Sequence, residues 1–391
     1  MLYSIPDHIK ISRFKRKKFS GSASCQNAFA VLKDRYNERS FLINETICRF
    51  LEKFITAKDL VAANKEIALE ANVSEENVRP FTEPFFDHLK KMEFIVNATS
   101  YKPVRTKALL RKNKVVDDYR IKAKLDSTSK TDIYVARHVA SKKNVVIKLL
   151  KQTHTENYKE FKKEYHLLTI LDSSGVTPRV FGLKEEKDYC YFIQEHIKGM
   201  ELNNYLEVHS NMRFKSFLSV ASAIIHSFSV IHHKGIVHGD IHPANLFVTS
   251  SKEVRVIDFG FALHQKLERN EIVNHGGVYF YMPPERINST THHKFLKQPD
   301  FFSDVFQFGV VLYKMLYNKY PFNGITWEEL AWEIKEKEPV FKNIAVFDFP
   351  VPAWMKQLIQ KCLSKDPQQR FADAAQLKKA FQKNMNHARK I

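Results

Sequence analysis

Apolar residues between about 36 and 97 recur at the spacing of amphipathic helices. The first stripe has its members at i, i+3, i+4 and i+7: Ile47, Phe50, Leu51 and Phe54. A second helix is predicted over 57–71, and a third begins at Ser74, a residue type that caps helix N-termini well. Pro80 and Pro84 inside the third pattern indicate a kink. With short strands expected near 40–43 and 93–97, residues 36–97 are predicted to form a winged-helix-like unit.

The pattern changes at about residue 119. Three short β-branched runs come first, and long helical patterns follow after residue 200: "DIYVARHV", "NVVIKLL" and "YCYFIQEH" are the three runs. Strands followed by helices favour an α+β domain with two lobes, 119–198 and 199–391, and a cleft between them. Residues 1–35 are predicted to be a basic, irregular arm, and residues 98–118 a basic linker.

The formal net charge of +19 over 391 residues indicates an anionic partner, such as a nucleotide, nucleic acid, an acidic peptide or a membrane surface. A merely basic, soluble surface is the alternative. The four cysteines form no CxxC pair, which argues against a zinc site or a disulfide framework and suits a reducing cytoplasm. Basic residues interrupt any N-terminal apolar run, and no uninterrupted apolar segment is long enough to span a bilayer, so a cytoplasmic location is expected.

Five residues carry the candidate chemistry, which is phosphoryl transfer. That reaction needs cations on the phosphates, a carboxylate near the attacking hydroxyl and ligands for Mg²⁺. Lys148 ends the strand-like "NVVIK", and Glu164 lies on a helical pattern where the two could form an ion pair. Asp240 in "HGDIHPAN" could orient the acceptor hydroxyl or take its proton, while Asn245 and Asp258 could hold Mg²⁺. Taken singly, Lys148 and Glu164 could equally be solvated surface residues.

This order of motifs resembles the eukaryotic-like protein kinases over about residues 119–385. Further segments carry the resemblance: "YFYMPPERI" at 279–287, "SDVFQFGVVLYKMLYNKYPF" at 303–322 with Asp304 at its start, and "CLSKDPQQRF" at 362–371. They separate the chain from aminoglycoside and choline kinases, which share only HGDxxxxN. The resemblance implies a bilobal protein-kinase-like fold, ATP and Mg²⁺ as cofactors, and a pairing of Arg370 with Glu285.

The resemblance also implies where the nucleotide binds. "FIQEHIKG" at 192–199 matches the hinge, so the backbone of Glu195 and Ile197 would bind adenine, with Gln194 as gatekeeper. Three apolar side chains would sandwich the ring, although they could also be ordinary core: Ile133, Val146 and Phe247.

The phosphate-binding loop departs from the family pattern, because residues 125–136 contain no glycine. Asp126, Thr128 and Thr131 stand at the three glycine positions, and side chains there hinder a close approach of backbone N–H groups to phosphates. The hydroxyls of Thr128 and Ser129, with Lys130, could substitute. An inactive pseudokinase remains an alternative, but it would have no chemical need for all five candidate residues.

Two further departures concern regulation and the acceptor. Gly239 stands where kinases regulated by activation-loop phosphorylation usually have Arg, and residues 261–284 contain no Ser or Thr, so a constitutively competent kinase is predicted. His242 and Val278 replace the usual Lys and Thr. His242 could donate to the γ-phosphate or could be a packed loop histidine. The acceptor therefore cannot be inherited from the family.

Residues 36–97 resemble PqqD-like domains, in which "FLINET" leads into a helix and "VSEENV" opens a third helix. Such domains serve pathways that modify ribosomally made peptides, and they bind a leader peptide as an added strand. The edge near 40–43 and the face around Asn77, Phe81 and Phe85 would form the docking groove, unless these aromatics simply pack the core. A DNA-binding winged helix is disfavoured, because the 74–92 helix carries four acidic residues against three basic ones.

The sequence thus predicts a Mg-ATP-dependent kinase that phosphorylates a Ser or Thr hydroxyl on a precursor peptide recruited by its N-terminal domain. Two alternatives stay open. One is a general eukaryotic-like Ser/Thr kinase with a regulatory N-terminal domain, and the other is a pseudokinase that acts as a peptide-binding scaffold.

Overall fold

The structure of the protein is a computed structural model. It describes most of the chain: residues 2–6, 9–13, 30–34, 39–43, 45–91, 94–99, 109–128, 130–151, 156–266, 278–287, 298–323 and 327–388. The chain divides into two compact units, one formed by Met1–Ala108 with Ser127–Ser129 and one by Leu109–Asp126 with Lys130–Ile391. Most of the basic run from Lys10 to Lys18 lies outside the described residues.

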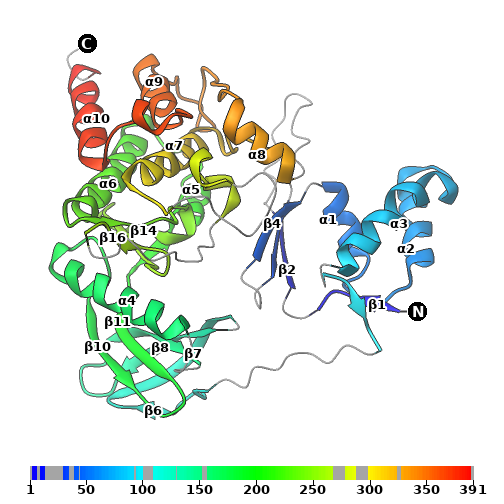
Figure 1. Cartoon of the computed structure of the whole chain (residues 1–391), viewed down its shortest axis with the longest axis horizontal. Coiled ribbons are helices and arrows are strands. Elements are labelled where there is room, and N and C mark those ends of the chain that lie inside the picture. Colours follow the sequence, from blue (N-terminus) through cyan, green and yellow to red (C-terminus); the bar gives the residue numbers. More distant parts are fainter. Residues whose placement is uncertain are drawn as a thin grey trace. The chain divides into compact units, whose positions relative to one another are not determined.

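The first unit contains three helices and two small antiparallel sheets (Figure 1). Its helices follow one another as the sequence predicts: α1 Glu45–Glu52, α2 Leu60–Ala71 and α3 Glu75–Lys91. A three-stranded sheet in the order β2-β3-β4 precedes them: β2 Ile9–Arg13, β3 Ala30–Asp34 and β4 Arg39–Ile43. Strand β1 (Tyr3–Ser4) pairs with β5 (Val96–Asn97). Helix α3 continues through both Pro80 and Pro84.

The core of this unit forms from the predicted helical stripe. Phe50, Leu51 and Phe54 are buried together with Phe86 and Leu89 of α3. Asp59 caps α2 by accepting a hydrogen bond from the N–H of Ala62 at 2.8 Å, which satisfies one of the exposed donors at the helix start.

The prediction of an irregular arm over 1–35 is wrong for β1, β2 and β3. Ile9 and Ile11 alternate with polar residues, which is the pattern of a half-buried strand, and Ile9 packs into the core of the first unit. The backbone of Tyr3 exchanges two hydrogen bonds with that of Lys58. The high content of Lys and Arg in this region hid the short alternation.

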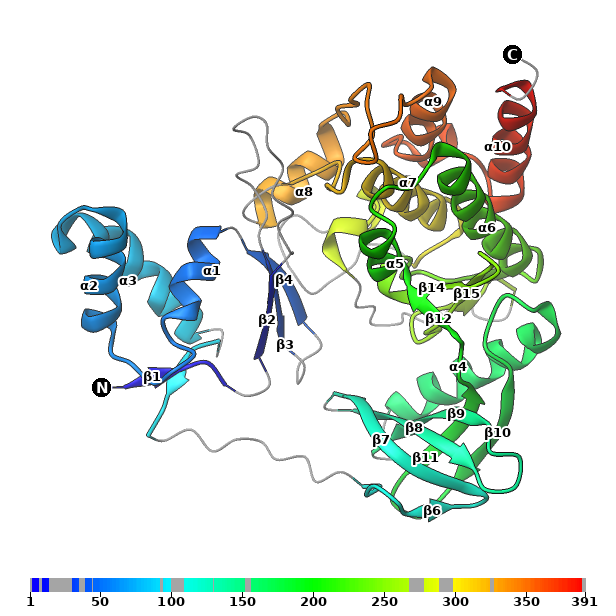
Figure 2. The same cartoon turned by 180° about the vertical axis from the view of Figure 1, so that it is seen from behind.

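The strand-rich lobe of the second unit is one six-stranded sheet in the order β10-β11-β9-β8-β7-β6 (Figure 2). Its elements are β6 Val115–Val116, β7 Tyr119–Ser127, β8 Thr131–His138, β9 Asn144–Leu150, α4 Glu156–Leu171, η1 Asp172–Ser174, β10 Val180–Glu185 and β11 Cys190–Glu195. On β8 and β9 the burial alternates up to Leu149: Tyr134, Ala136, Ile147 and Leu149 are fully buried, whereas Ile133, Val135, Val146 and Lys148 between them are partly exposed. The partly exposed face is the one that carries Ile133, Val146 and Lys148.

The predicted linker over 98–118 belongs in part to this lobe. Leu110 and Val116 are buried against Tyr134 in the same core cluster. The N–H of Leu110 donates to the Tyr134 hydroxyl at 3.3 Å, and the Tyr191 hydroxyl donates to Asp117 at 2.8 Å. The linker prediction is therefore wrong from Leu109 onward, because two short apolar contacts in a basic segment carry no periodic signal.

The helical lobe follows directly. Its helices and strands are β12 Gly199–Glu201, α5 Leu202–Val208, α6 Phe214–His233, β13 Ile236–Val237, η2 Pro243–Asn245, β14 Leu246–Thr249, β15 Val254–Val256, β16 Leu263–His264, η3 Tyr279–Tyr281, η4 Pro284–Arg286, α7 Phe301–Tyr317, α8 Trp327–Glu336, α9 Ala353–Cys362, η5 Pro367–Gln369 and α10 Ala374–Ala388. Helix α7 is buried along nearly its whole length and forms the centre of the lobe. A capping box between Asp300 and Ser303 fixes where it begins.

The expected ion pair between Glu285 and Arg370 is confirmed. The Arg370 guanidinium binds both carboxylate oxygens of Glu285 at 2.9 and 2.8 Å. Arg370 also donates to the carbonyls of Phe302, Ser364 and Lys365, so the buried charge is surrounded by acceptors, as such a group requires. This pair joins η4 to the start of α7 and to the segment after α9.

The prediction of an α+β fold with a strand-rich and a helical lobe is confirmed.

One helix in the described part of the chain, α6, is long and apolar enough to cross a membrane by length and composition. The prediction from the sequence concerns uninterrupted apolar segments, whereas Lys215 and His226 interrupt the apolar residues of α6. Phe217, Ile224 and Phe228 of this helix are fully buried, and α10 packs along it. It is a core helix of the helical lobe.

Candidate active site

Lys148 lies between two carboxylates. Its ammonium group on β9 contacts the carboxylate oxygens of Glu164 on α4 at 2.7 and 2.8 Å, and Oδ1 of Asp258 at 3.0 Å. Burial alone would lower the pKa of Lys148, but the charges of Asp258 and Glu164 outweigh it and raise the pKa. The ion pair that the sequence suggested is therefore formed, and it includes a third member.

Asp258 holds a backbone conformation that non-glycine residues rarely adopt. Its φ is 63°, in the left-handed region, which costs L-residues in general about 1–2 kcal/mol and which Asp adopts more readily than most of them. The Lys148 ammonium lowers the pKa of the Asp258 carboxyl to about 2, so this side chain is ionised at any physiological pH. About half of the side chain, 48%, is exposed, which leaves it accessible to a cation in solution.

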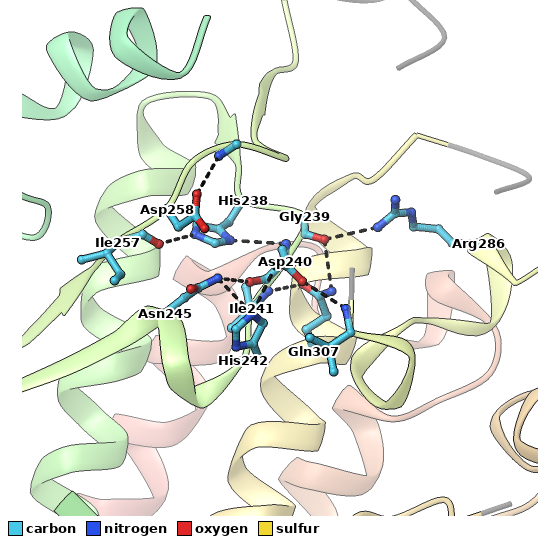
Figure 3. A network of polar contacts seen from close by, with 12 residues as sticks. His238, Gly239, Asp240, Ile241, His242, Asn245, Ile257, Asp258, Arg286 and Gln307 are labelled. Carbon is cyan, nitrogen blue, oxygen red and sulfur yellow. Dashed lines mark hydrogen bonds and ion pairs between the residues drawn. The ribbon is translucent and has the colours of Figure 1, made fainter. Parts of the chain in front are cut away.

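Hydrogen bonds to side chains of α7 hold the loop that carries Asp240 in place (Figure 3). The fully buried Asp304 accepts hydrogen bonds from the backbone N–H of His238 and of Gly239, both at 2.8 Å. It also accepts one from Nε2 of His232 at 3.0 Å. That assignment follows from the other ring nitrogen, because Nδ1 of His232 accepts from the N–H of Ala374.

Two further residues hold this loop, and the sequence reasoning missed both. Gln307 accepts from the N–H of Ile241 at 2.9 Å and donates to the carbonyl of Gly239 at 3.2 Å. The guanidinium of the buried Arg286 donates to the same carbonyl at 3.3 Å. A usable signal existed for Gln307, since it lies three residues after Asp304 inside an otherwise apolar helix, and buried polar groups need partners.

His238 links the Asp240 loop to the strand end before Asp258 (Figure 3). Its Nε2 donates to the carbonyl of Ile257 at 3.2 Å, and its Nδ1 accepts from the N–H of Asp240 at 3.3 Å. This pair of contacts requires the neutral ring. Burial lowers the pKa of His238, which favours that neutral form.

Asp240 has one contact to each carboxylate oxygen. The N–H of Val278 donates to Oδ1 at 3.4 Å, and Nε2 of His242 lies 3.3 Å from Oδ2. Val278 cannot supply the hydroxyl that the family usually places there, but its backbone N–H contacts the same carboxylate. The structure therefore brings His242 to Asp240, as the acceptor chemistry would need.

Asn245 is oriented by its neighbours. Its Nδ2 donates to the carbonyl of Asp240 at 3.0 Å and lies 3.2 Å from Nε2 of His242. With the amide nitrogen directed at these two atoms, Oδ1 is the atom left for a cation. Amide and carboxylate oxygens are the ligands that Mg²⁺ prefers, so Asn245 and Asp258 fit a magnesium site.

Two of the predicted adenine contacts, Ile133 and Val146, share one face of the strand-rich lobe, and the third, Phe247, lies on β14 of the helical lobe. Ile133 on β8 is the register partner of Lys148 on β9, and Val146 is the partner of Gln194 on β11. Ile133, Val146 and Phe247 are half-buried, not fully buried core. The N–H of Glu195 already donates to the carbonyl of Arg179 at 2.8 Å, which leaves the Glu195 carbonyl to accept from adenine. Ile197 follows β11 in the next segment.

The hairpin between β7 and β8 takes the place of the glycine-rich loop. Strand β7 runs to Ser127 and β8 begins at Thr131, so Thr128 and Lys130 lie at the tip. Ser129 lies outside the described residues. The positions of Thr128 and Lys130 agree with the predicted phosphate contacts, which stay predictions.

Comparison with known proteins places this site in a family. The protein kinase domain family matches residues 119–383, and the chain therefore belongs to the protein kinases, which are phosphotransferases.

Individual relatives agree with this assignment. The Serine/threonine-protein kinase PrkC of Bacillus subtilis is 25% identical over 274 residues, which cover 67% of this chain and 40% of that protein. The Serine/threonine-protein kinases PknA of Corynebacterium glutamicum is 27% identical over 272 residues, 66% of this chain and 55% of that protein. Aurora kinase C of Mus musculus is 25% identical over 286 residues, which cover 72% of this chain and 96% of that protein. The chain spans less than two thirds of the length of the two bacterial relatives.

Gly239 is required by the backbone at its position. Its φ is +76°, and a Cβ atom there would lie 2.9 Å from the carbonyl oxygen of Phe261 and 3.1 Å from Pro299. The arginine that many family members have at this position would need both neighbours to shift. This supports the prediction that the site is not controlled through an arginine pocket for a phosphorylated loop.

We expect Gly239→Ala to lower the free energy of unfolding by about 3 kcal/mol. The left-handed backbone would contribute about 1–2 kcal/mol and overpacking about 1–3 kcal/mol. Gly175→Ala is the matched control, because Gly175 has a φ of +71° but a Cβ atom added there would have no atom of the described residues within 4 Å. Gly175→Ala should lower the free energy of unfolding only by the contribution of the left-handed backbone, about 1–2 kcal/mol. Urea denaturation measures both, and equal losses would contradict the proposed contact with Phe261.

Proposed function

We propose that the protein is a Mg-ATP-dependent kinase that phosphorylates a Ser or Thr hydroxyl on a precursor peptide recruited by its first unit. The single observation that carries the catalytic half is the contact of Lys148 with both Glu164 and Asp258. This contact joins the two lobes at the atoms where phosphates and magnesium would bind. An assembled ion pair of this kind is the condition for phosphoryl transfer in protein kinases.

Each residue then has a defined task. Lys148 binds the phosphates and is fixed by Glu164, while Asn245 and Asp258 would hold Mg²⁺, which would supply positive charge against the transferred group. Asp240 orients the acceptor hydroxyl and takes its proton. The backbone of Glu195 and Ile197 binds adenine between Ile133, Val146 and Phe247.

His242 is the proposed partner of the transferred phosphate. Its Nε2 lies close to Asp240 and to Asn245, where the family usually has a lysine. A histidine reaches less far than a lysine and donates from a fixed ring plane. The site would therefore accept a narrower range of hydroxyl positions than a lysine would allow.

The arrangement favours a catalyst over a pseudokinase scaffold. A chain that only bound peptides would have no need to keep Lys148, Glu164, Asp240, Asn245 and Asp258 in these contacts. The relatives named as serine/threonine-protein kinases support the hydroxyl class of the acceptor. They also keep the general Ser/Thr kinase with a regulatory first unit as the second candidate.

The first unit supports peptide recruitment through its sheet. In the described order β2-β3-β4, strand β4 (Arg39–Ile43) lies at an edge, and an edge strand can pair with an added peptide strand. Asn77 on α3 is exposed, while the side chains of Phe81 and Phe85 lie outside the described ones. This part of the proposal rests on the resemblance of 36–97 to PqqD-like domains, and so does the link to ribosomally made, modified peptides.

Nucleic acid is a poorer partner for this unit. Helix α3 begins with Glu75 and Glu76. Two of its basic residues already lie near acidic neighbours, Arg79 beside Glu75 at 3.9 Å and Lys90 beside Asp87 at 3.8 Å. A recognition helix needs basic side chains directed at phosphates and bases.

We expect Asp240→Asn to lower kcat for phosphate transfer about a thousandfold, since general-base catalysis supplies about 10²–10⁴. The affinity for ATP should change less than threefold, because Asp240 is not assigned to the nucleotide. Intact mass spectrometry of the peptide measures transfer, and calorimetry measures ATP binding. Asp172→Asn, a substitution on the other lobe, is the control. Transfer that survives in Asp240→Asn would refute the catalytic assignment.

A cycle of two truncations tests the recruitment. The peptide would be used with and without its leader, and the enzyme as the full chain and as residues 109–391. Removing the leader or the first unit should each raise KM for the peptide at least tenfold, with kcat changed less than threefold. Removing both should raise KM no further than removing either one, because the leader and the first unit would act through the same docking contact. That contact raises the effective concentration of the peptide to about the millimolar range. Fully additive losses would point to the general Ser/Thr kinase instead.

A further inference from the structure

A buried carboxylate lies next to the glycine-free hairpin. Asp132 on β8 is fully buried, with a relative exposure of 0%. Lys151 lies 3.1 Å from its Oδ1 and Lys124 3.7 Å from the same atom. The hydroxyl of the buried Tyr134 donates to Oδ2 at 2.8 Å. This cluster takes no part in the chemistry assigned above.

Charge balance explains why three groups surround Asp132. A carboxylate removed from water is unfavourable unless cations and hydrogen-bond donors replace the lost hydration. Burial, followed by the contact with Asp132, raises the pKa of Tyr134, so its hydroxyl stays a donor. The N–H of Leu110 in turn donates to the Tyr134 oxygen, which ties the cluster to the segment that precedes β6.

The cluster connects strands β7, β8 and β9, which lie side by side in the sheet (Figure 2). Lys124 belongs to β7, Asp132 to β8, and Lys151 directly follows β9. Asp132 immediately precedes Ile133, whose register partner is Lys148. The N–H of Lys151 donates to the carbonyl of Lys130 at the hairpin tip at 2.9 Å. One carboxylate therefore fixes both arms of the hairpin relative to the strand of Lys148.

A loop without glycine has a specific need for such a contact. Glycine lets backbone N–H groups approach phosphates closely, and residues 125–136 have none. Contact with phosphates must then come from side chains at the tip, which reach further and have more rotamers to order. Holding the hairpin arms in place lowers that ordering cost.

We propose that Asp132 is a positioning residue for ATP: its ion pairs with Lys151 and Lys124 hold the β7–β8 hairpin so that Thr128 and Lys130 contact the phosphates. The inference rests on the proposed nucleotide-binding function. It assigns to a buried ion-pair cluster the task that glycines perform elsewhere in the family.

The test compares ligands with and without phosphates on the full chain. Calorimetry would measure adenosine, ADP and a non-hydrolysable ATP analogue with Mg²⁺ on Asp132→Asn and on wild type. Asparagine keeps the size and the contact with Tyr134 but removes the charge. We expect adenosine affinity to change less than twofold and the affinity for the ATP analogue to fall at least tenfold. The affinity for ADP should fall by a factor between those for adenosine and for the ATP analogue.

Asp117→Asn is the matched control, because Asp117 also accepts from a tyrosine hydroxyl of the same lobe at 2.8 Å, that of Tyr191, but lies away from the hairpin. It should leave all three affinities within twofold. Lys124→Met is the second variant, since it removes the longer ion pair and keeps the shorter one. It should weaken the ATP analogue by a smaller factor than Asp132→Asn, again without affecting adenosine.

Two results would overturn the inference. Equal weakening of adenosine and the ATP analogue in either variant would mean that the cluster only stabilises the lobe. Unchanged affinity for the ATP analogue in a folded Asp132→Asn would mean that the hairpin does not depend on it. The calorimetry measures nucleotide binding and no phosphate transfer, so it tests this inference even if the peptide kinase proposal fails.

Discussion

The position of one ammonium group decides whether this protein has an active site. Lys148 lies on β9, Glu164 on α4, and Asp258 follows from the helical lobe 110 residues later in the chain. Two carboxylates brought this close would repel each other, and the lysine between them removes that repulsion. The contacts of Lys148 with both carboxylates therefore stabilise the arrangement of β9, α4 and the segment that carries Asp258.

The acceptor side of the site depends on a different set of contacts. Asp304 and Gln307 of α7 hold the backbone on either side of Asp240 through four hydrogen bonds. Because these residues are buried in the centre of the helical lobe, the backbone around Asp240 is anchored to its core. Gly239 suits this arrangement, since its backbone passes close to Phe261 and Pro299.

Motif spacing made the catalytic residues predictable from the sequence. The chemistry of phosphoryl transfer requires particular residue types in a particular order, which identified Lys148, Glu164, Asp240, Asn245 and Asp258. The order of the later motifs identified the pair of Glu285 and Arg370 in the same way. The contacts of Asp304, Gln307 and Arg286 depend on tertiary packing across more than forty residues, and no local pattern reports that. The burial of Asp132 likewise depends on lysines in two other segments, which no local pattern reports. Strands β1 to β3 and the segment after Leu109 were missed for a similar reason, since their apolar residues are few and set among basic ones.

We infer that this site transfers phosphate without an activating modification. The early time course of transfer from Mg-ATP tests this, with protein that intact mass spectrometry shows to be free of phosphate. We expect a rate that is constant from the first turnover and is unaffected by prior incubation with ATP. A lag that disappears as the enzyme phosphorylates itself would contradict it, and so would the absence of any transfer to peptide or protein.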